Sequence, residues 1–129
     1  MDQVAFYRAK LAYEIDSADV VESQRQGNAP VLIDGRSPAA YAAETLPGAI
    51  NLPRPFDAAI VAQLPRDRLL VAFCDGIGCN ASTKTALKLA ELGFDVKELM
   101  GGLDWWKRDG YATTATPGKA VECGCGGGI

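Results

Sequence analysis

The sequence predicts an α/β domain built on a largely parallel sheet. Short apolar segments typical of strands buried on both faces alternate along the chain with segments of helical periodicity. This alternation is that of strand–helix–strand units, whose sites lie beyond the carboxyl ends of the strands. The chain has 129 residues and 48% hydrophobic content, which is enough to bury one core, so we expect one main domain.

The expected elements follow from apolar runs, caps and turn residues. The strongest strand signal covers residues 69–73 and runs directly into Cys74. Further strands are expected at residues 31–34, 49–51 and 96–100, and helices at residues 3–15, 16–27, from 37, 57–64, 80–92 and 103–109. Residues 1–15 are expected to be an N-terminal helical extension and residues 16–112 the main domain. Residues 113–129 lack a hydrophobic period and are expected to be a flexible, Gly- and Cys-containing tail.

Composition excludes several function classes. The chain has 16 acidic and 13 basic residues, and the basic residues are spread along it, so neither nucleic acid nor an anionic membrane is an expected partner. No stretch approaches the roughly 18 apolar residues of a membrane span, and the N-terminus does not resemble a secretory leader, so we expect a cytoplasmic protein. The chain contains no histidine, which excludes Cys-His and Ser-His-Asp hydrolases and His-ligated zinc enzymes.

The segment that follows the strongest strand has the composition of a reactive-cysteine loop. In a reducing compartment the four cysteines of the chain are more often chemical than structural. Glycines in the loop and the start of the next helix direct N–H groups and partial positive charge toward a thiolate, so we expect a lowered pKa for Cys74. The alternative is that Cys74 is a buried core residue. The expected loop consists of Asp75, Gly76, Ile77, Gly78, Cys79 and Asn80.

Four segments with distinctive residue patterns lie across residues 16–111. They are Val31-Leu32-Ile33-Asp34-Gly35-Arg36-Ser37, Leu46-Pro47-Gly48-Ala49-Ile50-Asn51-Leu52-Pro53, the strand and loop at Cys74, and Gly101-Gly102-Leu103-Asp104-Trp105. In their order and separations, these segments together resemble the single-domain rhodanese family.

This resemblance implies a fold, an activity and a catalytic residue. The fold is a central, mostly parallel sheet with helices on both faces. The activity is the transfer of sulfane sulfur from thiosulfate, a persulfide or a polysulfide to cyanide or a thiol, with Cys74 as the nucleophile that carries a persulfide. The implied partners are small sulfur donors and acceptors, including a thiol-containing acceptor protein, and no metal or organic cofactor is implied.

The chain departs from the family pattern in the loop after Cys74. Relatives commonly carry Arg-Ser about five residues after the cysteine, whereas Cys79 and Asn80 occupy those positions here. The phase of the following helix indicates a loop about two residues longer than usual. Without an arginine fork, we expect this loop to bind doubly charged oxyanions such as thiosulfate poorly.

The remaining candidate residues each have alternative interpretations. Cys79 is either a second reactive thiol, resolving Cys74 or taking over its sulfur, or a small packing residue. Asp34 and Arg36 are expected to brace the loop, with substrate-anion binding by Arg36 as the alternative. Asp75 is expected to face solvent, and Asn80 or Ser82 to cap the following helix. Of the adjacent tryptophans, Trp105 is expected in the core and Trp106 near the surface.

Two questions stay open at this level. Cys123 and Cys125 are incidental residues of a tail, a mobile sulfur relay, or part of a soft-metal site. The functional alternatives to a transferase are a non-catalytic sulfur-carrier or thiol- or metal-sensing module, and a cysteine phosphatase or arsenate reductase. The last class places an arginine at the end of its loop, and this chain has none between Cys74 and Lys84.

Overall fold

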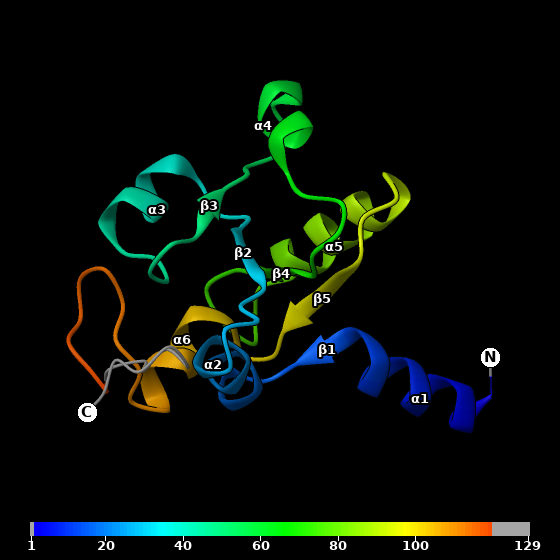
Figure 1. Cartoon of the computed structure of the whole chain (residues 1–129), viewed down its shortest axis with the longest axis horizontal. Coiled ribbons are helices and arrows are strands. Elements are labelled where there is room, and N and C mark those ends of the chain that lie inside the picture. The colour runs from blue at the N-terminus through cyan, green and yellow to red at the C-terminus, as the bar shows by residue number, and fades with distance from the viewer. Residues whose placement is uncertain (1, 120–129) are drawn as a thin grey trace.

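The computed structural model describes residues 2–119 and contains one five-stranded sheet in the order β1-β5-β4-β2-β3 (Figure 1). Every neighbouring pair of strands is parallel, which confirms the expected α/β fold class. The strands are β1 (Glu14–Ile15), β2 (Val31–Asp34), β3 (Ile50–Asn51), β4 (Leu70–Phe73) and β5 (Val96–Leu99). The reactive-cysteine loop follows β4, the central strand.

Helices connect the strands and begin at the residues that the sequence suggested. Side chains at Asp2, Asp16, Ser37 and Asp57 each accept a hydrogen bond from a backbone N–H in the first turn of the helix that follows. The helices are α1 (Gln3–Tyr13), α2 (Ser17–Arg25), α3 (Pro38–Ala43), α4 (Ala58–Gln63), α5 (Ala81–Glu91) and α6 (Gly102–Arg108). None of the helices that the structure describes is long and apolar enough to cross a membrane.

Alternate residues of each central strand enter different halves of the core. Leu32 packs in a cluster with residues of α2 and α6, whereas its neighbour Ile33 packs in a cluster with residues of α4 and α5. The sheet is therefore covered on both faces, as expected. All four residues of β4 are buried, which explains its uninterrupted apolar sequence.

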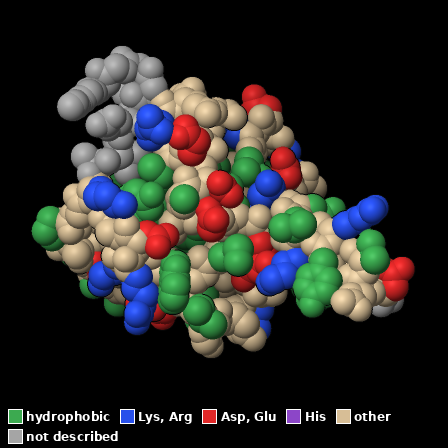
Figure 2. Space-filling view, turned by 90° about the horizontal axis from the view of Figure 1, so that it is seen from below, with side chains coloured by type: hydrophobic (Ala, Val, Ile, Leu, Met, Phe, Trp, Pro, Cys, Tyr) green, Lys and Arg blue, Asp and Glu red, His purple; other side chains and the backbone are tan. Residues whose placement is uncertain are grey.

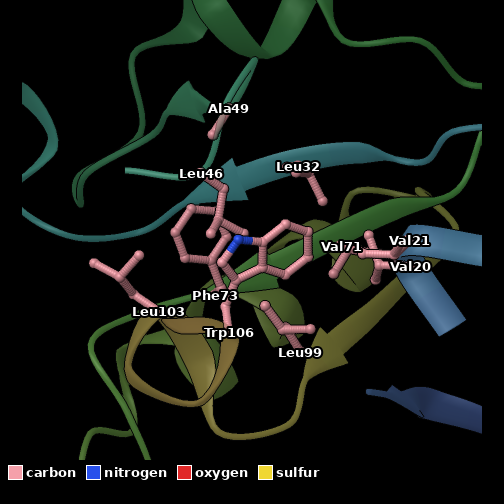
Figure 3. Packing of buried hydrophobic residues seen from close by; sticks show 10 residues of the cluster. All are labelled: Val20, Val21, Leu32, Leu46, Ala49, Val71, Phe73, Leu99, Leu103 and Trp106. Atoms are coloured by element: carbon pink, nitrogen blue, oxygen red, sulfur yellow. The ribbon is translucent and has the colours of Figure 1, made fainter. Parts of the chain in front are cut away.

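The two adjacent tryptophans lie opposite to our expectation. Trp106 is 1% exposed and packs near Phe73 and Leu46 in the core (Figure 3), whereas Trp105 is 44% exposed. The reason is the phase of α6, which places Leu103 and Trp106, three residues apart, on its inner face. The indole N–H of Trp106 donates to the carbonyl of Ala112 at 3.0 Å, so the buried ring has no unpaired polar atom.

The N-terminal segment is a helix followed by an edge strand. The helix that we predicted over residues 3–15 ends at Tyr13, because Glu14 and Ile15 pair with Glu98 and Leu99 at the edge of the sheet. Helix α1 has no buried residue and extends from the body of the molecule (Figures 1 and 2). Its exposed large hydrophobic residues are Val4, Phe6, Tyr7, Leu11 and Tyr13.

The described part of the C-terminal segment is attached to the domain. We expected flexibility from Thr113 onward, but the hydroxyls of Thr113 and Thr116 both donate to the Glu44 carboxylate. The Thr45 N–H donates to the Thr114 hydroxyl at 2.9 Å. Hydrogen bonds of polar groups make this attachment, so the hydrophobic pattern of the sequence carries no sign of it.

Candidate active site

Cys74 lies directly after the central strand, at the carboxyl edge of the sheet. It is 1% exposed. Its carbonyl accepts a hydrogen bond from the Leu103 N–H at 2.9 Å, and the carbonyl of Asp75 accepts one from the Asp104 N–H at 2.8 Å. The first turn of α6 therefore holds the backbone on which the cysteine is placed.

Glycine is required where α6 approaches this loop. Gly102 has φ +58°, and a Cβ at this position would lie 2.4 Å from the carbonyl oxygen of Cys74. Gly101 has φ +77°, and its Cβ would lie 2.4 Å from the Cβ of Trp105. The Gly-Gly pair of the Gly-Gly-x-x-Trp segment thus lets a helix pack directly against the cysteine loop.

The loop turns back so that its second cysteine meets the first. The Cys79 N–H donates to the Gly76 carbonyl at 3.1 Å, which closes the turn. The Cys74 thiol lies 3.3 Å from the carbonyl oxygen of Cys79 and 3.5 Å from the hydroxyl oxygen of Ser82, both within hydrogen-bonding range for sulfur. Both cysteines are free thiols.

The two thiols differ in their ionisation. Burial raises the pKa of the Cys74 thiol, hydrogen bonds with Ser82 oppose this rise, and the interaction with Cys79 adds to it. A hydrogen bond with Cys74 lowers the pKa of Cys79, and the backbone N–H groups of Ala81 and Asp75 lower it further. Our expectation of a lowered pKa for Cys74 is therefore wrong for this arrangement, because burial outweighs the hydrogen bonds of Ser82 with the thiol.

A cavity of about 600 Å³ opens beside the loop. Cys79 is among its lining residues and Cys74 is not. The charged side chains along its lining are three carboxylates and the ammonium group of Lys10, which forms a 2.6 Å ion pair with Glu14. The lining comes from the loop and the start of α5, from α1, β1 and the residue after β1, and from β5, α6 and the segment between them. The lining residues are Lys10, Glu14, Asp16, Gly76, Ile77, Gly78, Cys79, Asn80, Ser82, Thr83, Glu98, Leu99, Met100, Gly101, Gly102 and Trp105.

Sequence reasoning missed the role of Glu98. Its carboxylate accepts hydrogen bonds from the hydroxyls of Ser82 at 2.7 Å and Thr83 at 2.6 Å, at the start of α5. We expected Asn80 or Ser82 to cap this helix, but Asn80 occupies the cap position without a side-chain hydrogen bond, and Ser82 is committed to Glu98. A charged residue inside an expected strand, beside Leu99, was the signal that could have identified Glu98.

Arg36 and Asp34 form a bidentate ion pair beneath the loop. The guanidinium donates to both carboxylate oxygens of Asp34, at 3.0 Å and 2.8 Å, and to the carbonyl of Glu44. It also donates to the Asp75 carboxylate at 3.2 Å. Arg36 is 8% exposed at its side chain and does not line the cavity, so its geometry is that of a loop brace.

The structure describes Asp75 but not the two cysteines near the C-terminus. Asp75 faces solvent as expected, with its side chain 71% exposed. Cys123 and Cys125 lie outside the described residues. Within residues 2–119, no group of three or more Asp, Glu or Cys side chains is arranged to hold a metal ion.

The sequence model of the rhodanese-like domain matches residues 17–109. The chain belongs to the rhodanese-like family. A sulfurtransferase from Allochromatium vinosum is 29% identical over 105 residues, which cover 81% of this chain and 97% of that protein. An HTH-type transcriptional regulator from Mycobacterium tuberculosis is 33% identical over 87 residues, and the matched region spans 67% of this chain but only 38% of the regulator.

Solved structures show the same rhodanese-like fold. The BH2092 protein from Bacillus halodurans superposes with a TM-score of 0.80 at 33% identity, covering 89% of this chain and 85% of that one. A protein from Lactobacillus plantarum has a TM-score of 0.72 at 26% identity, covering 83% and 92% of the two chains. The family match begins at residue 17, so α1 and β1, which contribute Lys10 and Glu14 to the cavity, precede the matched region.

Proposed function

We propose that this rhodanese-like protein is a sulfurtransferase in which Cys74 accepts sulfane sulfur as a persulfide and passes it to a thiol or to cyanide. The observation that carries the proposal is the position of Cys74. It lies at the carboxyl end of the central strand, inside a loop that α6 holds from one side and that borders a cavity on the other. This is where an α/β sheet places reactive groups.

The chemistry needs two exchange steps at sulfur. A Cys74 thiolate attacks the outer sulfur of the donor, the donor's S–S bond breaks, and the rest of the donor leaves as a thiolate or sulfite. An acceptor thiolate or cyanide then attacks the outer sulfur of the persulfide and restores the Cys74 thiolate. Neither step uses a cofactor, and both need reduced thiols, so we infer that the protein works in the cytoplasm.

The cavity favours one class of donor. Glu14, Asp16 and Glu98 outnumber Lys10 along its lining, and Arg36 is committed to Asp34. A dianion such as thiosulfate would be repelled there, whereas a persulfide or polysulfide of lower charge would not. We infer that persulfides and polysulfides are the better donors.

A non-catalytic module for sulfur carriage or for thiol or metal sensing is the second candidate. The similarity to part of a transcriptional regulator favours it, because in such a protein a rhodanese-like region is joined to other sequence. Turnover distinguishes the two candidates: a carrier binds one sulfur atom, whereas a transferase consumes donor and cyanide repeatedly.

Substituting the nucleophile tests the proposal. We expect Cys74→Ser to abolish every product of sulfur uptake at residue 74 after exposure to polysulfide, whether a one-sulfur adduct or a disulfide, and to abolish thiocyanate formation from cyanide. The serine hydroxyl has no neighbouring base strong enough to activate it. Intact-mass spectrometry, peptide mapping and a thiocyanate assay measure this, and circular dichroism checks the fold. Substantial turnover by folded Cys74→Ser protein would identify another thiol as the nucleophile.

A further inference from the structure

The Cys74 thiol lies 3.3 Å from the carbonyl oxygen of a second cysteine of the loop, Cys79, although a single nucleophile is sufficient for sulfur transfer. This contact places the two residues side by side, and the interaction of their side chains raises the pKa of Cys74 and lowers the pKa of Cys79. A persulfide formed on Cys74 would therefore form within reach of a second sulfur nucleophile. Intramolecular attack by such a neighbour is favoured over attack by a diffusing thiol because its effective concentration is high.

We propose that Cys79 resolves the Cys74 persulfide, so that the protein releases the transferred sulfur as hydrogen sulfide and closes a Cys74–Cys79 disulfide. This inference rests on the proposed function, since it begins from the Cys74 persulfide. It adds a second, reductive outcome for the same sulfur atom.

The step balances in atoms and electrons. The Cys79 thiolate attacks the inner sulfur of the Cys74 persulfide, a bond forms between the two cysteine sulfurs, and the bond to the outer sulfur breaks. The outer sulfur leaves with the electron pair as hydrosulfide, so sulfane sulfur is reduced and the two cysteines are oxidised to a disulfide. An external dithiol then returns both cysteines to thiols and is itself oxidised to a disulfide.

The environments of the two cysteines suit these separate roles. The hydrogen bond with Cys74, together with N–H groups of the loop, lowers the pKa of Cys79 and so favours its thiolate, the attacking form, near neutral pH. Cys74 is 1% exposed, which favours attack on its persulfide by the neighbouring Cys79 over attack by a diffusing thiol. Cys79 lines the cavity, so its sulfur is the one that an external dithiol can reach to open the disulfide.

A single-turnover experiment without added reductant tests the inference. Reduced protein is mixed with less than one equivalent of cysteine persulfide, and released sulfide, intact mass and peptide maps are followed together. We expect the native chain to release sulfide and to lose two hydrogen atoms in a disulfide that joins the Cys74 and Cys79 peptides.

The matched variants are Cys79→Ser and Cys79→Ala. In both we expect a one-sulfur adduct mapped to Cys74 and sulfide release slower by about tenfold or more, because the neighbouring nucleophile is lost. The adduct itself reports that the site is folded and reactive. Peptide mapping separates these products from any adduct on Cys123 or Cys125.

Three other outcomes would overturn either the resolving role of Cys79 or the proposed function. A stable Cys74 adduct in the native chain, without sulfide or disulfide, would overturn the resolving role and leave the proposed transferase standing. Equal sulfide release by the native chain and by the Cys79 variants would overturn the role as well. Absence of both adduct and disulfide at Cys74 in every chain would overturn the proposed function.

Discussion

The two cysteines of the site differ in ionisation, and the nearby arginine is paired with carboxylates. Burial disfavours the thiolate of Cys74, whereas backbone N–H groups and the Cys74 thiol favour that of Cys79. Arg36, a cation that could have bound an anionic donor, is instead paired with Asp34, Asp75 and the carbonyl of Glu44. The site therefore contains two thiols and several carboxylates, and no arginine of residues 2–119 lines its cavity.

Donor preference is the prediction at the residue scale. We expect kcat/KM for thiosulfate to be lower than that for a persulfide by about tenfold or more, because no arginine fork pairs with the dianion. Glu98→Gln removes a cavity carboxylate and should raise kcat/KM for thiosulfate by about threefold or more, narrowing the difference between donors.

A carboxylate outside the cavity provides the control for that measurement. Glu91→Gln, at the end of α5, removes the same charge from an exposed position that does not line the cavity, so it should leave the donor ratio close to that of the native chain. Equal efficiency with the two donors in the native chain would mean that backbone N–H groups alone suffice for the dianion.

At the scale of the elements, the site depends on the junction between α6 and the loop after β4. The N–H groups of Leu103 and Asp104 donate to the carbonyls of Cys74 and Asp75, and Gly102 permits the approach. Helix α5 contributes Ser82 and Thr83, which connect its first turn to Glu98 on β5. Neighbouring elements thus hold the loop in place, since residues 74–80 themselves form neither a helix nor a strand.

Gly102→Ala tests this junction. The added methyl group would lie 2.4 Å from the Cys74 carbonyl oxygen, at a backbone conformation of φ +58° that disfavours side chains. We expect a loss of about 2–4 kcal/mol in the free energy of unfolding, together with reduced sulfur transfer. Urea denaturation and the thiocyanate assay measure the two effects.

Gly78→Ala is the matched control for stability. A Cβ at Gly78 meets nothing within 4 Å, so this variant should change the free energy of unfolding by less than about 1 kcal/mol. A Gly102→Ala protein as stable as Gly78→Ala would show that α6 can move away from the loop at little cost.

On the scale of the whole molecule, two core layers enclose the sheet, and polar clamps attach the segments outside them. Glu44 accepts hydrogen bonds from Thr113 and Thr116 and forms a 3.0 Å ion pair with Lys107. The hydroxyls of Thr113 and Thr116 and the Lys107 ammonium lower the pKa of Glu44 to about 2. The C-terminal segment is thus connected to the domain through a carboxylate that must stay ionised.

The clamp predicts a component of stability that depends on pH. Because the folded-state pKa of Glu44 is about 2, below its ordinary value of 4.5, its contribution is fully present above pH 4.5 and is lost as pH falls toward 2. We expect Glu44→Gln to lower the free energy of unfolding by about 1–3 kcal/mol near neutral pH and by much less near pH 2. Denaturant titrations at several pH values measure the difference.

An exposed ion pair is the comparison for that titration. Glu22 pairs with Arg25 at 2.5 Å, but both side chains are about half exposed, so Glu22→Gln should cost less than about 1 kcal/mol. A Glu44→Gln effect that is small and independent of pH would show that the C-terminal segment contributes little to stability.

Local sequence information was sufficient for much of the fold. Apolar runs identified the buried strands, and capping residues such as Asp16 and Ser37 marked helix starts, because these signals act within a few residues. Their alternation was enough to predict a parallel sheet with the loop after Leu70–Phe73 at its carboxyl edge. The ends of the elements were harder to predict from local signals. Glu14 and Ile15 form a strand because they pair with β5, which lies far along the chain.

The sequence by itself determined the reactive loop, the pair of cysteines in it, the absence of histidine and the absence of an arginine between Cys74 and Lys84. Tertiary structure decided which thiol meets the cavity, because burial and N–H direction depend on how α5 and α6 pack around the loop. It also decided the exposure of Trp105 and the pairing of Ser82 with Glu98, which lie on contacts between separate elements. Such contacts depend on helix phase and strand register across the chain, which no short segment encodes.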